Sequence, residues 1–148
     1  MKIAILMGSE KDHAKMLPAS EVLGGMGIEH DVFVMSAHRN PAKVADFSRS
    51  ARASGYAAII CGAGKAAHLA GAVAANSTLP VIGVPIAAGG LGGIDALLST
   101  VQMPTGIPVA TVAVDSAANA AYLAASILSV HDADTAAALE AYRESLAG

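Results

Sequence analysis

The chain has 148 residues, of which 54% are hydrophobic, 14% are charged and 3% are aromatic, and its formal net charge is −3. This length suits one domain with its own core, so we expect residues 1–148 to form a single domain. The negative charge and the scarcity of aromatic side chains argue against a nucleic-acid partner, because phosphate backbones need basic surfaces and bases need stacking platforms.

Short apolar runs alternate with helical patterns along the whole chain. The predicted strands are residues 3–7, 28–35, 57–61, 81–84 and 109–114. The predicted helices are residues 12–26, 41–54, 66–76, 94–101, 117–130 and 132–146. Apolar strands that alternate with helices are typical of a parallel sheet covered on both faces. We therefore expect a flavodoxin-like α/β fold, a three-layer sandwich whose five-stranded parallel sheet has the order 2-1-3-4-5.

In a sheet of this order the ligand crevice lies at the carboxyl ends of the first and third strands. The three loops with the most polar chemistry follow the first three predicted strands, at residues 8–12, 36–41 and 62–71. We therefore expect these three loops to converge on one crevice.

The first loop contains Gly8, Ser9 and Asp12 at the start of a predicted helix. A glycine turn, a hydroxyl and free backbone N–H groups at a helix entrance can bind an anion. Asp12 has two interpretations: it caps the helix, or its carboxylate accepts hydrogen bonds from a ribose diol.

The second loop, SAHRNP, combines Ser36, Ala37, His38 and Arg39 before Pro41, which suits the first position of a helix. A guanidinium gives paired donors to a phosphate, and a serine hydroxyl gives another. Histidine is the side chain best suited to moving a proton near neutral pH. We predict that Ser36 and Arg39 hold a phosphate and that His38 transfers a proton. The alternative is that His38 only caps or packs.

The third loop, GAGKAAHLAG, contains Gly64, Lys65, Ala66 and His68. Its glycines allow backbone N–H groups to approach a ligand, but it lacks the GxxxxGK[ST] spacing of a nucleotide-binding loop, so ATP binding is not expected. His68 is predicted in the first turn of a helix, where it is either a neutral hydrogen-bond partner or a packing residue.

Several other kinds of site are not expected. The sequence has no cysteine pair, no HxxxH or HExxH spacing for a metal and no GxSxG turn for a nucleophilic serine. His13, His30 and His131 have no partner nearby in sequence, so we expect them at the surface. The residues by themselves therefore predict a crevice for a small phosphorylated ligand, with one or two histidines for proton transfer.

Four segments resemble the PurE family: MGSEKD at 7–12, SAHRNP at 36–41, GAGKAAHLAG at 62–71 and VQMPTGIP at 101–108. The similarity runs through essentially the whole chain. It implies a flavodoxin-like octamer that acts in purine biosynthesis on an aminoimidazole ribonucleotide, with no cofactor. The family contains a mutase, which rearranges N5-carboxyaminoimidazole ribonucleotide, and a carboxylase, which adds free CO2 to aminoimidazole ribonucleotide. Because the mutase motif is SAHR and the carboxylase motif is SAHK, Arg39 favours the mutase.

The resemblance also implies roles for individual residues. His38 would carry the proton, with His68 beside it, after CO2 leaves the carbamate and is captured by the ring carbon. Ser9, Asp12, Ser36 and Arg39 would bind the ribose phosphate. The whole predicted substrate-binding set is Gly8, Ser9, Asp12, Ser36, Ala37, Arg39, Gly64, Lys65 and Ala66.

The chain departs from the family pattern at four places: Lys11 replaces a small residue, Lys65 a glycine, Ala70 a proline, and 89–93 a segment that contains serine. Lys65 either holds a carboxylate or points into solvent. These departures leave three alternatives open: the carboxylase, a related enzyme acting on another heterocycle, and a non-catalytic nucleotide-monophosphate sensor.

The apolar content exceeds what one small core needs, so we expect a homo-oligomer. No apolar run could cross a bilayer without meeting a charge, a proline or a glycine cluster, so no membrane contact is expected. The N-terminal KIAILM lacks the pattern of an export signal, and Cys61 has no cysteine partner and is expected to be a buried thiol. Together these features favour the cytoplasm.

Overall fold

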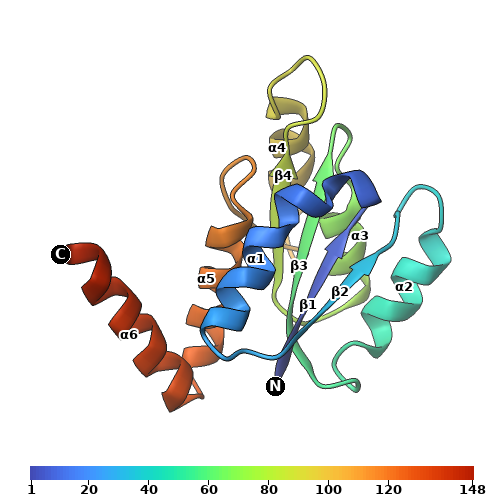
Figure 1. The fold of residues 1–148 in the computed structure, drawn as a ribbon. Coiled ribbons are helices and arrows are strands. Elements are labelled where there is room, and N and C mark those ends of the chain that lie inside the picture. Colours follow the sequence, from blue (N-terminus) through green and yellow to red (C-terminus); the bar gives the residue numbers. More distant parts are fainter.

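Apolar runs bounded by glycine or polar residues form the five strands of a computed structural model that describes residues 1–148 (Figure 1). The strands are β1 (Lys2–Met7), β2 (His30–Val34), β3 (Tyr56–Gly64), β4 (Val81–Ile86) and β5 (Ala110–Thr111). They form one parallel sheet in the order β2-β1-β3-β4-β5. The predicted sheet and its order are confirmed.

The helices alternate with the strands along the chain. They are the short 3-10 helix η1 (Glu10–Asp12), α1 (His13–Gly25), α2 (Pro41–Ser50), α3 (Leu69–Asn76), α4 (Ile94–Val101), α5 (Ala117–Ser129) and α6 (Ala133–Ala147). None of these helices has the length and apolar character needed to cross a bilayer.

Alternating side chains of β1 build the two halves of the core. Ile3 and Ile5 face the cluster that contains buried residues of α1 and α5, whereas Ala4 and Leu6 face the cluster that contains buried residues of α2 and α3. Successive side chains of a strand point to opposite faces of a sheet, so an apolar strand requires a helix layer on each side. The predicted three-layer sandwich is confirmed, and Figure 1 shows the sheet between its two helix layers.

The last strand is much shorter than the predicted 109–114. Gly83 and Pro85 of β4 turn their carbonyls toward this segment, where Val112 N–H and Asp115 N–H donate to them at 3.0 and 2.8 Å. In a parallel strand the N–H and C=O of one residue point to the same side, so Pro85 also turns its nitrogen toward this segment. Because proline has no N–H, the regular ladder ends there.

Several other boundaries also differ from the prediction. β3 continues to Gly64 because residues 62–64 pair with Val84, Pro85 and Ile86, so its last glycines lie in the strand rather than in the loop. α3 begins at Leu69 rather than 66, which makes His68 its N-cap residue instead of a first-turn residue. α2 ends at Ser50 rather than 54.

Helix α6 lies outside the three layers and packs against α5 (Figure 1). The contact includes stacked rings of Tyr122 and Tyr142, whose centroids are 4.3 Å apart with planes inclined by 16°.

On the opposite side of the sandwich core, Cys61 is buried within β3 as predicted, and burial raises the pKa of its thiol.

Candidate active site

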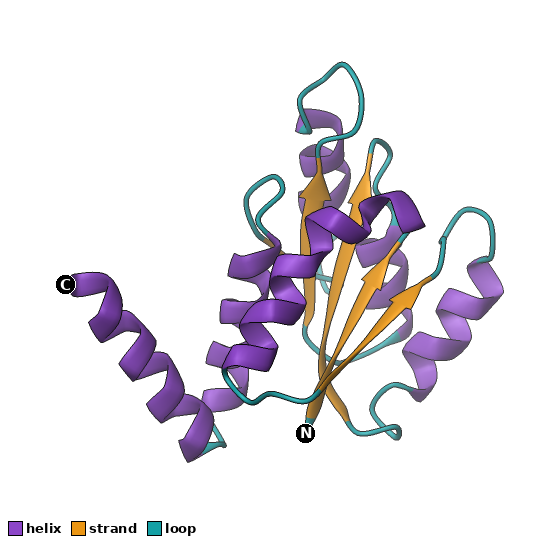
Figure 2. Cartoon of the chain, in the orientation of Figure 1, coloured by secondary structure: helices purple, strands orange, loops and turns teal.

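The loops that follow β1, β2 and β3 meet at the carboxyl end of the sheet, where they line a crevice of about 470 Å³. Figure 2 shows these loops at the arrowhead ends of the strands. This volume lies in the range of small-molecule sites. All of the predicted catalytic and substrate-binding residues line the crevice: Gly8, Ser9, Asp12, Ser36, Ala37, His38, Arg39, Gly64, Lys65, Ala66 and His68. Their roles stay predictions.

The imidazoles of His38 and His68 contact each other in this crevice. His38 comes from the loop after β2 and His68 from the loop after β3, 30 residues further along the chain. Nε2 of His38 and Nδ1 of His68 form a hydrogen bond, with the rings edge to face. One ring must donate the shared proton and the other accept it, so the pair can hold and pass a proton.

Asp12 does not cap helix α1, which removes one of its two interpretations. Its side chain makes no capping hydrogen bond, whereas the Ser9 hydroxyl caps η1 by accepting from the Lys11 N–H at 3.3 Å. Burial raises the pKa of the Asp12 carboxyl, although the backbone at Ser9 and the charge of Lys15 act in the opposite direction. Because it caps no helix, the Asp12 side chain has oxygen atoms free to accept hydrogen bonds from a ligand.

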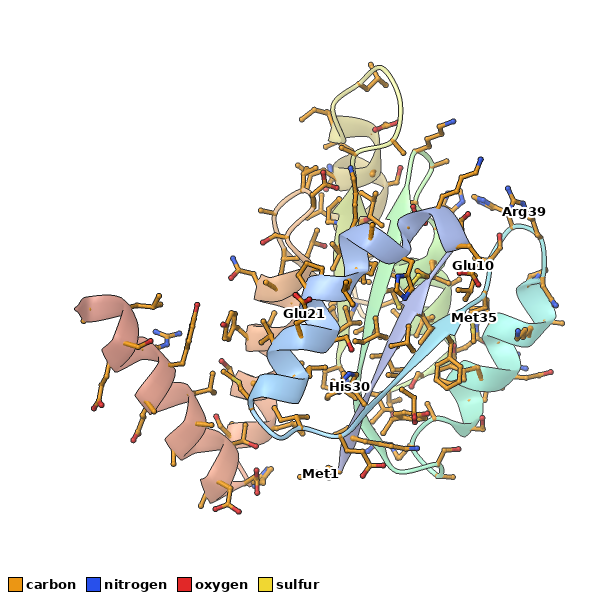
Figure 3. The ribbon with its side chains drawn as sticks, in the orientation of Figure 1. Met1, Glu10, Glu21, His30, Met35 and Arg39 are labelled. Atoms are coloured by element: carbon orange, nitrogen blue, oxygen red, sulfur yellow. The ribbon has the colours of Figure 1, made fainter.

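The second loop is a tight turn that presents the Arg39 side chain to solvent. Ser36 Oγ accepts from the Arg39 N–H at 3.1 Å, and Asn40 caps α2 by accepting from the Lys43 N–H at 3.1 Å. The guanidinium of Arg39 forms no ion pair. Figure 3 places Arg39 at the tip of this loop, at the same end of the sheet as Glu10. The turn thus fixes the Ser36 hydroxyl and leaves the cation free.

The third loop approaches the segment after β4 closely. A Cβ added to Gly64 would lie 2.9 Å from the Cβ of Ala88 and 3.1 Å from the carbonyl oxygen of Ile86, so this contact requires glycine. Lys65, the next residue, has the left-handed φ of +54°, which L-residues rarely adopt. Ala88 thereby forms one wall of the crevice.

Sequence reasoning missed four residues that also line the crevice: Lys11, Ala63, Leu69 and Ala88. Lys11 stands inside the first predicted loop, so its position could have suggested it. Ala88 follows β4, which neighbours β3 in the predicted order, and that order could have indicated it as well. Ala63 and Leu69 stand inside the third predicted loop, so their position could have suggested them, although their apolar side chains carry no chemical signal.

The expected surface position of His30 is wrong. His30, the first residue of β2, is half-buried against α1, and its Nδ1 donates to the Ile28 carbonyl at 3.0 Å. Its Nε2 therefore accepts from the Ser20 hydroxyl at 2.6 Å when the ring is neutral. His13 and His131 are exposed, as predicted. No three His, Cys, Asp or Glu side chains lie close enough together to hold a metal ion.

The model of the AIR carboxylase family matches residues 2–148. The chain belongs to this family. It is 48% identical over 145 residues to the N5-carboxyaminoimidazole ribonucleotide mutase of Escherichia coli K12, covering 97% of this chain and 86% of that protein. The mutase of Thermotoga maritima is 46% identical over 143 residues, covering 97% of this chain and 84% of that one.

Solved structures of this family share the fold. The crystal structure of Treponema denticola PurE superposes with a TM-score of 0.89 at 32% sequence identity, covering 98% of this chain and 90% of that one. The resemblance to the PurE family and the flavodoxin-like fold are confirmed.

Proposed function

We propose that this protein is an N5-carboxyaminoimidazole ribonucleotide mutase, which converts that compound into 4-carboxy-5-aminoimidazole ribonucleotide in purine biosynthesis. The observation that carries the proposal is the contact between His38 and His68 in a crevice that also contains Arg39. Relatives from Escherichia coli and Thermotoga maritima that bear this name cover nearly the whole chain and support it.

The substrate is a nucleotide with a phosphate at one end and a carbamate at the other. The unpaired guanidinium of Arg39, with the hydroxyls of Ser36 and Ser9, binds the phosphate through charge-assisted hydrogen bonds. The carboxylate of Asp12, which does not cap a helix, accepts hydrogen bonds from the ribose hydroxyls. The remaining proposed binding residues line the same crevice and would surround the imidazole ring: Gly8, Ala37, Gly64, Lys65 and Ala66.

The reaction balances without a cofactor. The N–C bond of the carbamate breaks, its electron pair stays on nitrogen, which takes the proton shared by His38 and His68, and CO2 is held in the crevice. The enamine-like ring carbon then attacks CO2. Once the new C–C bond has formed, this carbon carries both the carboxylate and its original hydrogen. His38 removes that proton, and its contact with His68 provides a second imidazole to share it.

The alternative is a carboxylase that uses free CO2. Arg39 in the SAHR motif and the relatives named as mutases favour the mutase. The test is to convert substrate that carries a labelled carbamate in the presence of unlabelled bicarbonate. We expect the label to be retained in the product. A reaction that exchanges the label completely, or that requires added CO2, would assign the carboxylase instead.

The other two alternatives have separate signatures. A nucleotide-monophosphate sensor needs the phosphate ligands but no proton-transfer pair. The contact between His38 and His68 therefore favours an enzyme over a sensor. An enzyme for another heterocycle would bind the aminoimidazole ribonucleotides weakly and leave the labelled carbamate unconverted.

We also infer a homo-octamer of one-domain chains, acting in the cytoplasm. Helix α4 presents Ile94, Leu98 and Val101 along one exposed stripe, 55%, 52% and 43% accessible, and Leu91 beside them is 66% accessible. Apolar patches of this kind are usually covered by a partner. Light scattering at micromolar concentration should give eight times the 14.6 kDa of one chain, and a monomer mass would refute the octamer.

The free thiol of Cys61 supports a reducing compartment.

A further inference from the structure

Lys65 is a cation in the crevice whose ammonium group has no partner. It is exposed and lines the crevice, yet its ammonium donates no hydrogen bond and joins none of the ion pairs of the chain. The three ion pairs are Lys2 with Asp31, Lys15 with Asp115 and Arg49 with Asp46. An unpaired lysine at the edge of a binding crevice is available to an anionic ligand group.

The backbone at Lys65 is strained. Its φ of +54° is a conformation that glycine adopts freely but that costs other residues on the order of 1–3 kcal/mol. No strong hydrogen bond accounts for this strain. The only hydrogen bond at Lys65 is a long one of 3.5 Å, from Ser99 Oγ to the Lys65 carbonyl oxygen. Strain of this kind concentrates at ligand sites.

The side chain of Lys65 extends along the segment that follows β4. A Cβ built on Gly89 would lie 3.6 Å from the Cε of Lys65, so the lysine stem lies beside this segment. Because Gly89 has no side chain, the stem can lie against its backbone. The end of the side chain therefore lies near the segment that follows β4.

Arg39 and Lys65 lie on opposite sides of the crevice. Arg39 follows β2 and Lys65 follows β3, and β1 lies between these two strands. Two strand spacings put their backbones roughly 10 Å apart. The His38–His68 pair joins the same two loops, so the proton-transfer groups share one crevice with both cations.

This arrangement matches a ligand with two anionic groups and a reacting ring between them. We propose that Lys65 binds the carboxylate of the nucleotide, on nitrogen in the substrate and on carbon in the product, and thereby makes this crevice prefer carboxylated over uncarboxylated nucleotides. The assignment rests on the proposed function and names the ligand group that this residue recognises. Lysine suits the task because its point charge can follow a carboxylate between two positions, whereas a rigid guanidinium fork fixes one.

The test compares the dissociation constants of 4-carboxy-5-aminoimidazole ribonucleotide and aminoimidazole ribonucleotide by titration calorimetry. The two ligands differ only in the carboxylate. We expect Lys65→Met to weaken binding of the carboxylated nucleotide about 10-fold and to leave the uncarboxylated one within about 2-fold. Lys65→Arg should keep most of the preference.

Two further variants separate binding from folding. Lys65→Gly relieves the left-handed strain, so it should raise the melting temperature while still losing the preference. Lys11→Met, which removes another cation of the same crevice, should change both affinities by a similar factor. An unchanged affinity ratio in Lys65→Met, or an equal loss for both ligands, overturns the assignment. If the affinity ratio depends on Lys65 but the wild-type protein does not convert the carbamate substrate, the proposed function is refuted and the role of Lys65 in binding stands.

Discussion

The rings of His38 and His68 meet edge to face, with centroids 4.6 Å apart and planes inclined by 83°. Each belongs to a different loop, and those loops follow the two strands that flank β1. The sheet order alone brings them together, since neither helix nor strand contains both. A single proton on this hydrogen bond can reside on either ring, which suits a reaction that takes a proton from carbon and gives one to nitrogen.

Replacing His38 by Asn tests that role. Asn keeps polarity and approximate size but does not titrate near neutral pH, so His38→Asn should remove proton transfer. We expect turnover to fall by about 100- to 10,000-fold, with the affinity for aminoimidazole ribonucleotide and the oligomeric mass unchanged. Steady-state kinetics and calorimetry measure these quantities. Retention of more than about a tenth of the parent turnover would move the proton to another residue, His68 first.

Replacing Arg39 by Ala should mainly weaken substrate binding. Its guanidinium has no partner in the protein, so the variant loses a phosphate contact that ground state and transition state share. We expect KM to rise roughly 10- to 100-fold with kcat within a few-fold of the parent. Arg49→Ala is the matched control, since Arg49 is exposed and pairs with Asp46 on α2. A lowered kcat at unchanged KM would contradict the phosphate role.

The main features of the fold were predictable because they rest on local patterns. Apolar strands alternating with helices predicted the parallel sheet, and the crevice rule for its order selected the three loops that do meet. His38 and Arg39 stand together in one short motif, so their shared location needed no knowledge of distant contacts.

The features that escaped prediction depend on contacts between distant segments. The end of β5 is set by the missing N–H of Pro85 on the neighbouring strand, and the burial of His30 by the packing of α1, where Ser20 meets it. Lys15 and Asp115 pair across 100 residues. Nothing in the local sequence of any of these segments reports the partner.

Replacing Gly64 by Ala tests the wall of the crevice. The added methyl group would lie 2.9 Å from the Cβ of Ala88, so the segment after β4 must shift away. Overpacking of this kind costs about 1–3 kcal/mol, and we expect a lower melting temperature together with a reduced kcat/KM. Gly90→Ala is the control, because its Cβ would have no atom within 4 Å and its φ is not positive. Equal behaviour of the two variants would show that the close approach is unimportant.

The Lys15–Asp115 pair ties helix α1 to the segments that follow β4 and β5. Lys15 Nζ donates to Asp115 Oδ2 at 2.9 Å and to the Ala87 carbonyl at 2.7 Å, while the Ala87 N–H donates to Asp115 Oδ1 at 2.9 Å. Partial burial by itself would raise the pKa of Asp115, but these hydrogen bonds and the charge of Lys15 outweigh it and lower the pKa. We call this group of contacts between Lys15, Asp115 and Ala87 the clamp. It holds Ala87, which precedes Ala88 in the wall of the crevice.

This lowered pKa fixes the pH dependence expected for Asp115→Asn. A carboxyl whose pKa is lower in the folded state contributes stability above its unfolded value of about 3.9, and that contribution disappears as the pH falls through the folded value. Asn tolerates the φ of +58° at this position, so the substitution removes charge without adding backbone strain. Near pH 7 the variant should be less stable by up to about 1 kcal/mol, because the pair is partly exposed. Thermal unfolding followed from pH 7 to pH 2.5 should show the two melting temperatures converging in the acid range. A gap that stays constant to pH 2.5 would mean that the charge of Asp115 does not stabilise the clamp.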